Sequence, residues 1–521
     1  MSSTPPSPPE MWERAFAAKD PRFDGLFFVA VRSTGIYCRP VCPAPAAKRA
    51  NIVFYPNAAA AGAAGYRPCL RCRPELSPEA HAQVREEAVR RALALIAEGA
   101  LQDGSIAQLA AHVGLSARQL QRVFLSHVGA TPHVVHATRR LLLAKQLLSE
   151  TALPVADVAL AAGFNSSRRF HAAYKNGCGM PPGALRRRNT TDAAGADGLT
   201  LRLSYRPPLD FPLLLKFLSR RAIPGIERVE ADSYARVIGP AQTPAWLHVS
   251  ADPKRPELRL RIENADPRAI PDIVRRARRM FDLDADLCAV HGVLTHDPLL
   301  AGAIRLHPGL RVPCGWDGFE LAVRAVLGQQ ISVAGATTLA RRLVESYGAP
   351  LGKSGEDDSA AGRISTLRYG LNRAFPSPER LRDAPLETIG LPRTRAASLR
   401  ALSAAVADGR LSFAGGQRLE DFIERATTLP GIGAWTAQYI AMRGMALPDA
   451  FPAGDLVLQQ VLGRAQGKDR LSERATEAYS QSWRPWRAYA VLHLWHLPAE
   501  TAPATAKTAL TKNKPKKGKK T

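Results

Sequence analysis

Four cysteines near the N-terminus constrain this chain more than any other feature. Cys38 and Cys42 form one close pair, and Cys69 and Cys72 form a second pair further along the chain. Two close pairs of thiols separated by a loop are the donor set of a tetrahedral Zn²⁺ site. The chain has only 7 cysteines, and the other three stand alone. The pattern predicts one zinc ion held by four thiolates, in a small domain that needs the ion to fold.

Length and charge set the frame for the rest of the chain. A chain of 521 residues with 46% hydrophobic content is expected to form several domains, each with a core. The formal net charge of +25 favours a polyanionic partner, nucleic acid before a membrane. We find no signal-peptide pattern at residues 1–10 and no apolar run long enough to cross a bilayer. We therefore expect a cytoplasmic protein, in which paired cysteines favour metal binding over disulfides.

The local patterns divide the chain into six regions and predict a multidomain, mainly α fold. They predict short strands near residues 25–31, 51–55, 201–205 and 258–262 and a helix over 270–281. The expected regions are a small α/β zinc domain (8–78), an all-α domain (79–188), a polar linker (189–199), an α+β domain (200–285), an all-α domain (286–498) and a disordered Lys-rich tail (499–521).

Two similar blocks, residues 105–124 and 155–170, predict a tandem helix-turn-helix domain. Each block has a helix of small residues, then a glycine for a turn with positive φ (Gly114, Gly163), then a serine that can cap a second helix (Ser116, Ser166). That second helix is expected to enter the DNA major groove. The alternative is an ordinary helical bundle with solvated arginines. The candidate DNA contacts are Arg118, Gln119, Arg122, Arg168 and Arg169.

A glycine-containing run at residues 429–439 predicts a second DNA-binding element. Gly431 and Gly433 permit a tight hairpin, and the helix that follows starts with free backbone N–H groups that can seat a phosphate without reading sequence. Asp455 opens a further helix about twenty residues on. It can be a simple N-cap. It can also be a functional carboxylate, because N–H groups at a helix start favour the ionised form.

The residues around the cysteines, 28–42 and 65–72, closely resemble the zinc domain of the Ada family of bacterial DNA-methylation sensors. The resemblance implies that Cys38 accepts a methyl group from a methylphosphotriester in DNA. Zinc keeps such a thiol in its nucleophilic thiolate form. Methylation removes one negative charge near the phosphates, so it is expected to strengthen DNA binding. Arg39, Arg67 and Arg71 are candidate phosphate contacts, or else solvated surface residues.

The two helix-turn-helix blocks resemble the AraC-type transcription-factor domain, which follows the zinc domain directly in Ada-family regulators. The resemblance implies an activator that binds promoter DNA, with RNA polymerase as a possible further partner, associated with the bacterial nucleoid. The Pro-Cys-His-Arg run of the alkylguanine methyltransferase domain in full-length Ada proteins does not occur in this chain.

Residues 201–211, 319–333 and 483–490, together with the hairpin run, look like the AlkA family of 3-methyladenine DNA glycosylases, helix-hairpin-helix enzymes. The resemblance implies hydrolysis of the N-glycosidic bond of an alkylated base that is flipped into an aromatic pocket. Aromatic faces attract a cationic base, although each ring could instead be core packing. The residues that match the family's site are Asp455 as the catalytic carboxylate, Trp435, Tyr439 and Trp495 as the pocket, and Gln330 as the wedge.

The chain departs from the glycosylase pattern at two positions. Gln330 stands where many members have an apolar wedge, and Leu456 follows Asp455 where an aromatic residue is common. Trp435 stands where related strand-cutting enzymes have a lysine, so we expect a monofunctional glycosylase. No cysteine follows Cys314, which excludes the iron–sulfur loop of some relatives.

These patterns together predict a methylation-sensing activator fused to a repair glycosylase. Two alternatives remain open. In the first, the glycosylase half is only a DNA-binding scaffold for a regulator, and an assay of base release decides. In the second, the zinc and helix-turn-helix parts only raise the DNA affinity of an enzyme, and a methyl-sized mass increase at Cys38 decides.

Overall fold

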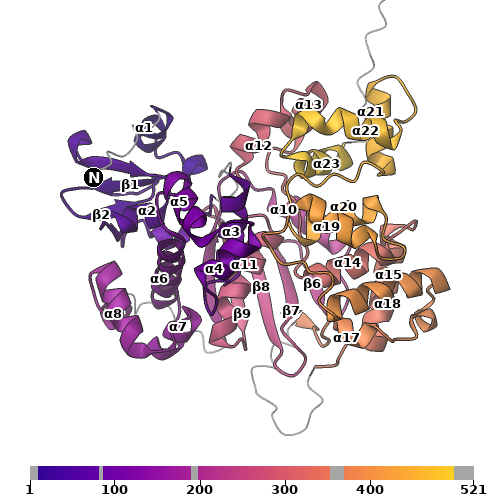
Figure 1. The fold of residues 1–521 in the computed structure, drawn as a ribbon, viewed down its shortest axis with the longest axis horizontal. Coiled ribbons are helices and arrows are strands. Elements are labelled where there is room, and N and C mark those ends of the chain that lie inside the picture. Colours follow the sequence, from indigo (N-terminus) through magenta and orange to yellow (C-terminus); the bar gives the residue numbers. More distant parts are fainter. Residues whose placement is uncertain (1–9, 81–85, 189–197, 352–368, 498–521) are drawn as a thin grey trace, which may run out of the picture.

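The computed structural model describes residues 10–80, 86–188, 198–351 and 369–497. An N-terminal half, made of a small sheet and nine α-helices, lies beside a C-terminal half built from a larger sheet and a helical body (Figure 1). Most of the predicted linker (189–197) and the predicted Lys-rich tail lie outside the described residues. Within the described part of the chain, the helices are too short or too polar to cross a membrane.

The four-stranded sheet of the N-terminal domain brings the cysteine pairs together. Its strand order is β3-β1-β2-β4, with β1 antiparallel to both β2 and β3 and with β2 parallel to β4. The strands predicted near 25–31 and 51–55 are present as β1 and β3. The elements are α1 (Glu10–Ala17), β1 (Phe28–Val31), β2 (Ile36–Cys38), β3 (Ile52–Tyr55), α2 (Ala58–Ala63), β4 (Arg67–Pro68) and the 3₁₀ turns Pro21–Phe23, Arg49–Asn51 and Pro74–Leu76.

Seven helices follow, and they contain both predicted helix-turn-helix units. Gly114 and Gly163 have φ of 79° and 76°, and Ser116 and Ser166 cap the second helix of each unit. Both of these local predictions are confirmed. The long helix α6 joins the units. The helices are α3 (Glu87–Ala97), α4 (Ile106–His112), α5 (Ala117–His127), α6 (Pro132–Glu150), α7 (Val155–Ala161), α8 (Ser167–Cys178) and α9 (Pro182–Arg188).

An antiparallel five-stranded sheet opens the C-terminal half, with strand order β5-β9-β8-β7-β6. The strands predicted at 201–205 and 258–262 are β5 and β9, and the predicted helix at 270–281 is α11. The elements are β5 (Leu199–Ser204), α10 (Phe211–Ser219), β6 (Glu227–Val229), β7 (Ser233–Ile238), β8 (Ala245–Ala251), β9 (Glu257–Glu263), the 3₁₀ turn Pro267–Ala269 and α11 (Ile270–Met280).

The rest of the described chain is helical, as predicted. The helices are α12 (Leu287–Leu294), α13 (Pro298–Leu306), α14 (Gly318–Leu327), α15 (Val333–Tyr347), α17 (Pro378–Leu381), α18 (Arg393–Ala407), α19 (Leu419–Thr427), α20 (Ala434–Gly444), α21 (Leu456–Ala465), α22 (Glu473–Tyr479) and α23 (Arg487–Trp495), with 3₁₀ turns Leu386–Ile389 and Ser480–Trp483.

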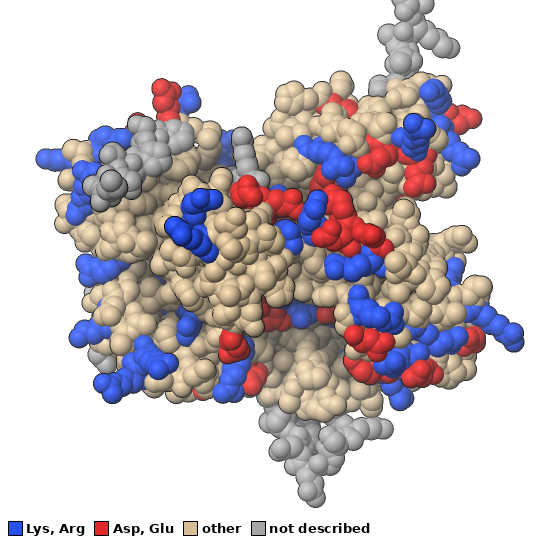
Figure 2. All heavy atoms as spheres, in the orientation of Figure 1, with Lys and Arg blue, Asp and Glu red and all other residues tan. Residues whose placement is uncertain are grey.

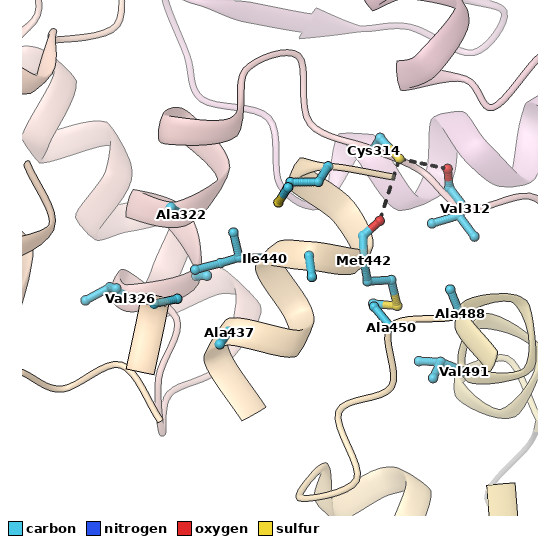
Figure 3. Close-up of a cluster of buried hydrophobic side chains, with 14 of the residues drawn as sticks. Val312, Cys314, Ala322, Val326, Ala437, Ile440, Met442, Ala450, Ala488 and Val491 are labelled. Carbon is cyan, nitrogen blue, oxygen red and sulfur yellow. Dashed lines mark hydrogen bonds between the residues drawn. The ribbon is translucent and has the colours of Figure 1, made fainter. Parts of the chain in front are cut away.

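The helical body packs around α20. Side chains of α14, α20 and α23 meet in the buried cluster of Figure 3, where the Cys314 thiol faces the carbonyl oxygens of Val312 and Met442. Ile440 and Ala437 of α20 point into this cluster. The cluster fixes one face of α20, so the opposite face can hold functional side chains in place.

The N-terminal and C-terminal halves share a hydrophobic core. Leu147 of α6 and Val158 of α7 belong to the same buried cluster as Leu201 of β5, Leu260 of β9 and Ile273 of α11. None of these five side chains is more than 6% exposed. The apolar face of the second helix-turn-helix unit is therefore buried partly against the larger sheet, not only within its own domain.

A buried ion network also crosses the boundary between the halves. Glu75, next to the cysteines, accepts from Lys145 Nζ of α6 at 2.5 Å and from Arg73 Nε at 2.9 Å. Arg73 also pairs with Glu150 at 2.9 Å, and Glu150 pairs with Arg202 of β5 at 2.8 Å. The side chains of Glu75 and Lys145 are 0% and 1% exposed. We call these five residues the interdomain ion network.

Two further contacts join the halves. The buried guanidinium of Arg206 donates to the backbone oxygens of Asp24 at 2.9 Å, Glu79 at 2.6 Å and Ala285 at 3.3 Å. At the other side of the seam, Glu98 at the end of α3 accepts from the backbone N–H of Gly415 at 2.8 and 2.9 Å. The seam encloses a cavity of about 1090 Å³ between the N-terminal helices and α11.

Charge is unevenly distributed over the surface. On the face shown in Figure 2, basic side chains predominate over the N-terminal half, and the C-terminal half mixes both signs. A surface of predominantly one sign attracts the opposite charge over several ångströms. The N-terminal half therefore suits the phosphate backbone of DNA.

Candidate functional sites

The four cysteines of the N-terminal sheet converge on one point. Their Sγ atoms all lie within 4.8 Å of one another, and Cys38 is the one that is not buried. A ZnS₄ tetrahedron with Zn–S bonds of about 2.3 Å places its sulfurs about 3.8 Å apart, so the arrangement fits the ion. The four cysteines form the predicted zinc site.

The local backbone explains this convergence. Parallel pairing of β2 with β4 sets Tyr37 beside Pro68, so the next residue of each strand, Cys38 and Cys69, lies at the same edge. Backbone N–H groups approach two of the sulfurs. Arg39 N lies 3.3 Å from Cys72 Sγ, and Arg71 N lies 3.3 Å from Cys69 Sγ. Such donors stabilise negative charge on sulfur, which favours thiolate ligands.

The structure corrects the expectation for Arg39. Its side chain is buried, and its guanidinium pairs with Asp24 (Nε to Oδ1 2.9 Å) and donates to the Cys72 carbonyl at 3.1 Å. It therefore braces the ligand loop and does not face a phosphate. Burying a guanidinium is favourable only when its donors are satisfied, and Asp24 supplies the acceptors. A local sequence pattern could not reveal this pairing, because Asp24 lies too far from Arg39 in the sequence. Arg67 and Arg71 are exposed beside the site, which fits both phosphate contacts and solvated surface residues.

The predicted DNA contacts of the helix-turn-helix units lie on their second helices. Arg118 and Arg122 of α5, and Arg168 and Arg169 of α8, are all exposed. Gln119 is also exposed, but its Oε1 accepts the backbone N–H of Ser116 at 3.0 Å in a capping box. In this structure Gln119 shapes the start of α5, and only its amide nitrogen is left for a base.

Asp455 caps α21, as one of the two interpretations of this residue predicted, but it also has partners that no cap requires. Its Oδ1 accepts the backbone N–H groups of Val457 at 3.0 Å and Leu458 at 3.1 Å. The indole N–H groups of Trp495 and Trp435 donate to Oδ1 and Oδ2, each at 3.2 Å. Four donors from three elements therefore fix the direction of this carboxylate.

Trp435, Tyr439 and Trp495 form one aromatic wall beside Asp455. The rings of Trp435 and Tyr439 stack with centroids 5.4 Å apart and 16° between their planes, and Trp495 lies 6.3 Å from Tyr439. All three rings and Asp455 line a cavity of about 760 Å³ bounded by α10, α14, α15, α20, α21 and α23. The structure brings the predicted pocket residues together around the predicted carboxylate.

The glycine hairpin between α19 and α20 has two glycines with different roles. Gly431 has φ of 76°, and a Cβ there would meet Ser398 Oγ at 2.0 Å. Gly433 is the N-cap of α20, with no side-chain cap, and a Cβ there would have nothing within 4 Å. Gly431 therefore makes the turn, and Gly433 keeps the start of α20 open to an approaching phosphate.

Gln330 is exposed between Gly328 and Ile331, which line the cavity, and has φ of 57°, an uncommon conformation for a residue other than glycine. Its neighbour Gln329 holds this turn in place. Gln329 Nε2 donates to Gly431 O at 2.8 Å and to Thr436 Oγ1 at 2.9 Å, and Arg395 donates to Gln329 O at 2.7 Å. The turn at Gln329 and Gln330, which we call the Gln330 turn, is thus joined to the glycine hairpin in one unit.

The sequence analysis missed several residues of this site. Arg443 extends the spacing of Trp435 and Tyr439 by one more turn of α20, so helical periodicity could have indicated it. Arg221 lies more than two hundred residues upstream, and no local signal points to it. The other missed residues are Gln329, Phe217, His307 and His496.

Four family models match the chain in order. They are the metal-binding domain of Ada (residues 10–75), a helix-turn-helix domain (109–188), the AlkA N-terminal domain (200–317) and the HhH-GPD superfamily of base excision DNA repair proteins (323–487). Together with the cysteine cluster and the aromatic pocket, they define a zinc-containing DNA-binding regulator joined to a base-excision glycosylase fold.

Curated relatives cover the same regions. A probable bifunctional transcriptional activator/DNA repair enzyme AlkA of Mycobacterium tuberculosis is 39% identical over 92% of this chain and 95% of its own length. DNA-3-methyladenine glycosylase 2 of Escherichia coli is 33% identical over 56% of this chain and 96% of that protein. The Escherichia coli enzyme Ada is 36% identical over 33% of this chain and 47% of that protein. The chain belongs to the family of bifunctional transcriptional activator/DNA repair enzymes.

Proposed function

We propose that Asp455 is the catalytic carboxylate of a monofunctional glycosylase that releases alkylated bases of the 3-methyladenine type from DNA. The observation that carries the proposal is the four-donor setting of Asp455 beside the aromatic wall. Among the described residues lining the cavity, the other carboxylates are Glu227 and Glu320, and both pair with arginines. Of these three described carboxylates, Asp455 is the one without an arginine partner.

The geometry supports the following steps. The damaged nucleotide leaves the duplex, Gln330 fills the gap, and the base lies against Trp435 and Tyr439. The bond from C1′ of the sugar to the base nitrogen breaks, and both electrons leave with the base. The Asp455 carboxylate stabilises the positive charge that develops on the sugar, or orients the water that adds to C1′. The added water loses a proton, and an abasic site remains.

The absence of a lysine just after the glycine hairpin favours hydrolysis over strand cleavage. Trp435 stands at the start of α20, where strand-cutting relatives have lysine, and no lysine lies between residues 425 and 464. No Schiff base with the sugar can therefore form from this part of the chain.

Release of bases from a methylated duplex tests the proposal. Asp455→Asn is expected to lower the single-turnover rate at least a hundredfold, an effect typical of losing one stabilising charge in a closed site. The circular dichroism spectrum should stay that of the wild type. The product strand should remain intact until alkali is added, and borohydride should trap no adduct. Base release by Asp455→Asn at the wild-type rate, or an adduct formed at the rate of release, would contradict the mechanism.

We further propose that Cys38 is the methyl acceptor. It is the most accessible of the four ligands, and exposed Arg67 and Arg71 lie next to the other pair. Bound zinc keeps the Cys38 sulfur in its thiolate form. The sulfur attacks the methyl carbon of a methylphosphotriester, an S–CH₃ bond forms, the O–CH₃ bond breaks, and an ordinary phosphodiester anion is left.

The transfer is expected to switch on DNA binding by the helix-turn-helix units, and through it transcription by RNA polymerase on the nucleoid. Loss of one negative charge beside the phosphates supports this direction. Mass spectrometry after exposure to methylated DNA should show one methyl group on Cys38. The methylated protein should bind its operator more tightly and with a different salt dependence. Identical titrations of both forms at several salt concentrations would exclude the switch.

A further inference from the structure

The cavity that holds Asp455 also contains two arginines, at least partly buried, that no carboxylate neutralises. Five arginines line it, and one of them, Arg220, is exposed to solvent. Arg236 and Arg324 form a buried cluster with Glu227 and Glu320, with contacts of 2.5 to 2.7 Å, so their charges cancel. In the part of the chain that the structure describes, Arg221 and Arg443 have no acidic partner within ion-pair distance. They line the same cavity, and among its arginines they are the two that are withdrawn from solvent without an acidic partner.

Both of these guanidiniums are held rigidly. The Arg443 side chain is buried, donates to Pro313 O at 2.7 Å and to the Tyr439 hydroxyl, and lies 5.4 Å from the centre of the Tyr439 ring. Arg221 donates to Phe217 O at 3.1 Å and stacks 3.7 Å from the centre of the Phe217 ring. Burial, and then the nearby Arg443, lower the pKa of Arg221 to about 10, so it stays charged at neutral pH.

The positive and negative charges lie at opposite ends of one aromatic stack. Asp455 bonds to the Trp435 indole, Trp435 stacks on Tyr439, and the Tyr439 hydroxyl bonds to Arg443. A base that lies on this stack with its sugar at Asp455 has its far edge toward the guanidiniums. The cavity therefore carries a fixed electric field along the bond that breaks.

We propose that Arg221 and Arg443 form a positively charged wall that promotes departure of the base, acting together with Asp455 at the sugar. This inference rests on the proposed role of Asp455. When the C1′–N bond breaks, the electron pair goes to the base, whose charge falls by one, and the sugar becomes positive. A cationic base becomes neutral and is relieved of repulsion from the wall. A neutral base becomes anionic and is attracted by it.

The wall has opposite effects on binding and on rate for cationic bases. It repels an N-alkylated cationic base before the bond breaks, which offsets the cation–π attraction of the rings. Arg443 already lies over the Tyr439 ring, so the ring attracts a cationic base less strongly. The charged wall nevertheless lowers the barrier to breaking the C1′–N bond. Its interaction with the base improves toward the transition state, and only such interactions accelerate a reaction. The wall should also extend the substrate class to neutral bases whose ring carries hydrogen-bond acceptors.

The test uses the full-length protein and two duplexes, one with a single 7-methylguanine, which is cationic, and one with a single hypoxanthine, which is neutral. Single-turnover release is measured over a range of enzyme concentrations, which separates the maximal rate from the half-saturating concentration. Arg221→Met, which keeps most of the side-chain volume, should lower the maximal rate on both duplexes by about ten- to fiftyfold. The half-saturating concentration should fall for 7-methylguanine only.

Controls separate charge from structure. Arg221→Lys keeps the charge and should recover most of the rate on both duplexes. Arg228→Met, on the exposed edge strand β6, should behave as the wild type. A maximal rate unchanged in Arg221→Met, a loss on only one duplex, or no recovery in Arg221→Lys would overturn the charged wall. If instead Asp455→Asn releases both bases as fast as the wild type, the result contradicts the proposed catalytic role of Asp455. This conclusion does not depend on the results with the arginine variants.

Discussion

At the scale of single residues, one carboxylate and two indoles organise the glycosylase site. Asp455 is oriented by two backbone N–H groups of α21 and by the ring nitrogens of Trp435 and Trp495. Each tryptophan therefore has two tasks, because its ring face lines the base cavity and its N–H points at the carboxylate. A substitution that keeps the ring and removes the N–H separates these tasks.

Trp435→Phe is such a substitution. It keeps an aromatic face for the base but leaves Oδ2 of Asp455 without its indole donor. We expect the maximal rate of base release to fall about tenfold, because one fixed donor near developing charge is lost. Single-turnover release from a methylated duplex measures this. Trp12→Phe, in the zinc domain and stacked on Phe27, is the matched control and should release bases at the wild-type rate. An unaltered rate in Trp435→Phe would exclude the orienting role.

His493, two residues before Trp495, gives the fold a dependence on pH. Burial, and then the neighbouring His291, lower the pKa of His493 to about 3. The unfolded chain takes up a proton near pH 6.5, while the folded protein stays neutral there. Stability is therefore complete above about pH 6.5 and is lost as the pH falls toward 3. The loss from this group should be about 2 kcal/mol at pH 5. Burial also lowers the pKa of His291 and of His496, which adds to the trend.

Chemical denaturation at pH 7 and pH 5 tests this dependence. His493→Leu removes the titrating ring and should reduce the difference in unfolding free energy between the two pH values. His133→Leu, at an exposed position of α6, is the control and should leave the difference unchanged. If His493→Leu shows the full wild-type difference, the acid sensitivity comes from other groups.

At the scale of elements, the hairpin, α20 and the Gln330 turn, which are the proposed DNA contacts of the glycosylase half, form one unit. The buried face of α20 packs on α14 and α23, and its other face presents Trp435, Tyr439 and Arg443 to the cavity. Gln329 joins the Gln330 turn to the hairpin and to α20. Under the proposed function, a phosphate held at the hairpin lies at a fixed distance from Gln330 and Asp455.

The two hairpin glycines provide a matched pair of variants. Gly431→Ala forces a Cβ into a left-handed conformation and against Ser398, and should destabilise the protein by about 1–3 kcal/mol. Gly433→Ala meets no protein atom within 4 Å and should unfold at the wild-type temperature. It should nevertheless weaken DNA binding, because its methyl group lies where the phosphate approaches. Thermal melts and duplex titrations separate these outcomes. Wild-type DNA affinity in Gly433→Ala would rule out phosphate binding at this point.

At the scale of the whole molecule, the N-terminal and C-terminal halves are not structurally independent. The second helix-turn-helix unit shares a core with the larger sheet, and the interdomain ion network runs from the cysteine loop through α6 to β5. Lys145 also donates to the carbonyl of the ligand Cys69 at 3.3 Å. The zinc centre is therefore in direct contact with groups that hold the two halves together.

Breaking the ion network tests this integration. Lys145→Met removes one of the two cations that pair with the buried Glu75, which should cost up to about 3–5 kcal/mol. The double variant Lys145→Met/Glu75→Gln removes both charges and should recover a large part of that loss. Arg341→Met breaks the exposed pair with Glu345 and should cost less than about 1 kcal/mol. Denaturation followed by tryptophan fluorescence measures all three. Wild-type stability in Lys145→Met would show that the network does not join the domains.

Features encoded over short spans of the chain could be predicted from its amino-acid order alone. The two cysteine pairs, the turn glycines Gly114 and Gly163, their capping serines and the hairpin before Asp455 are all patterns of fixed local spacing. Local spacing fixes backbone geometry directly, through a metal's coordination, a positive φ or a helix cap. For this reason the zinc site, both helix-turn-helix units and the position of Asp455 follow from the residues themselves.

Which charges meet, in contrast, depends on the tertiary fold. Arg39 lies next to a zinc ligand, as its position suggests, but Asp24 draws its guanidinium inward. Arg221 and Arg443 lie far apart in the sequence and come together at Tyr439, while Arg236 and Arg324 in the same cavity are neutralised by glutamates. The residue type is arginine in every case. Whether a buried charge is cancelled or left to act depends on partners brought close by folding, and no periodic pattern records those partners.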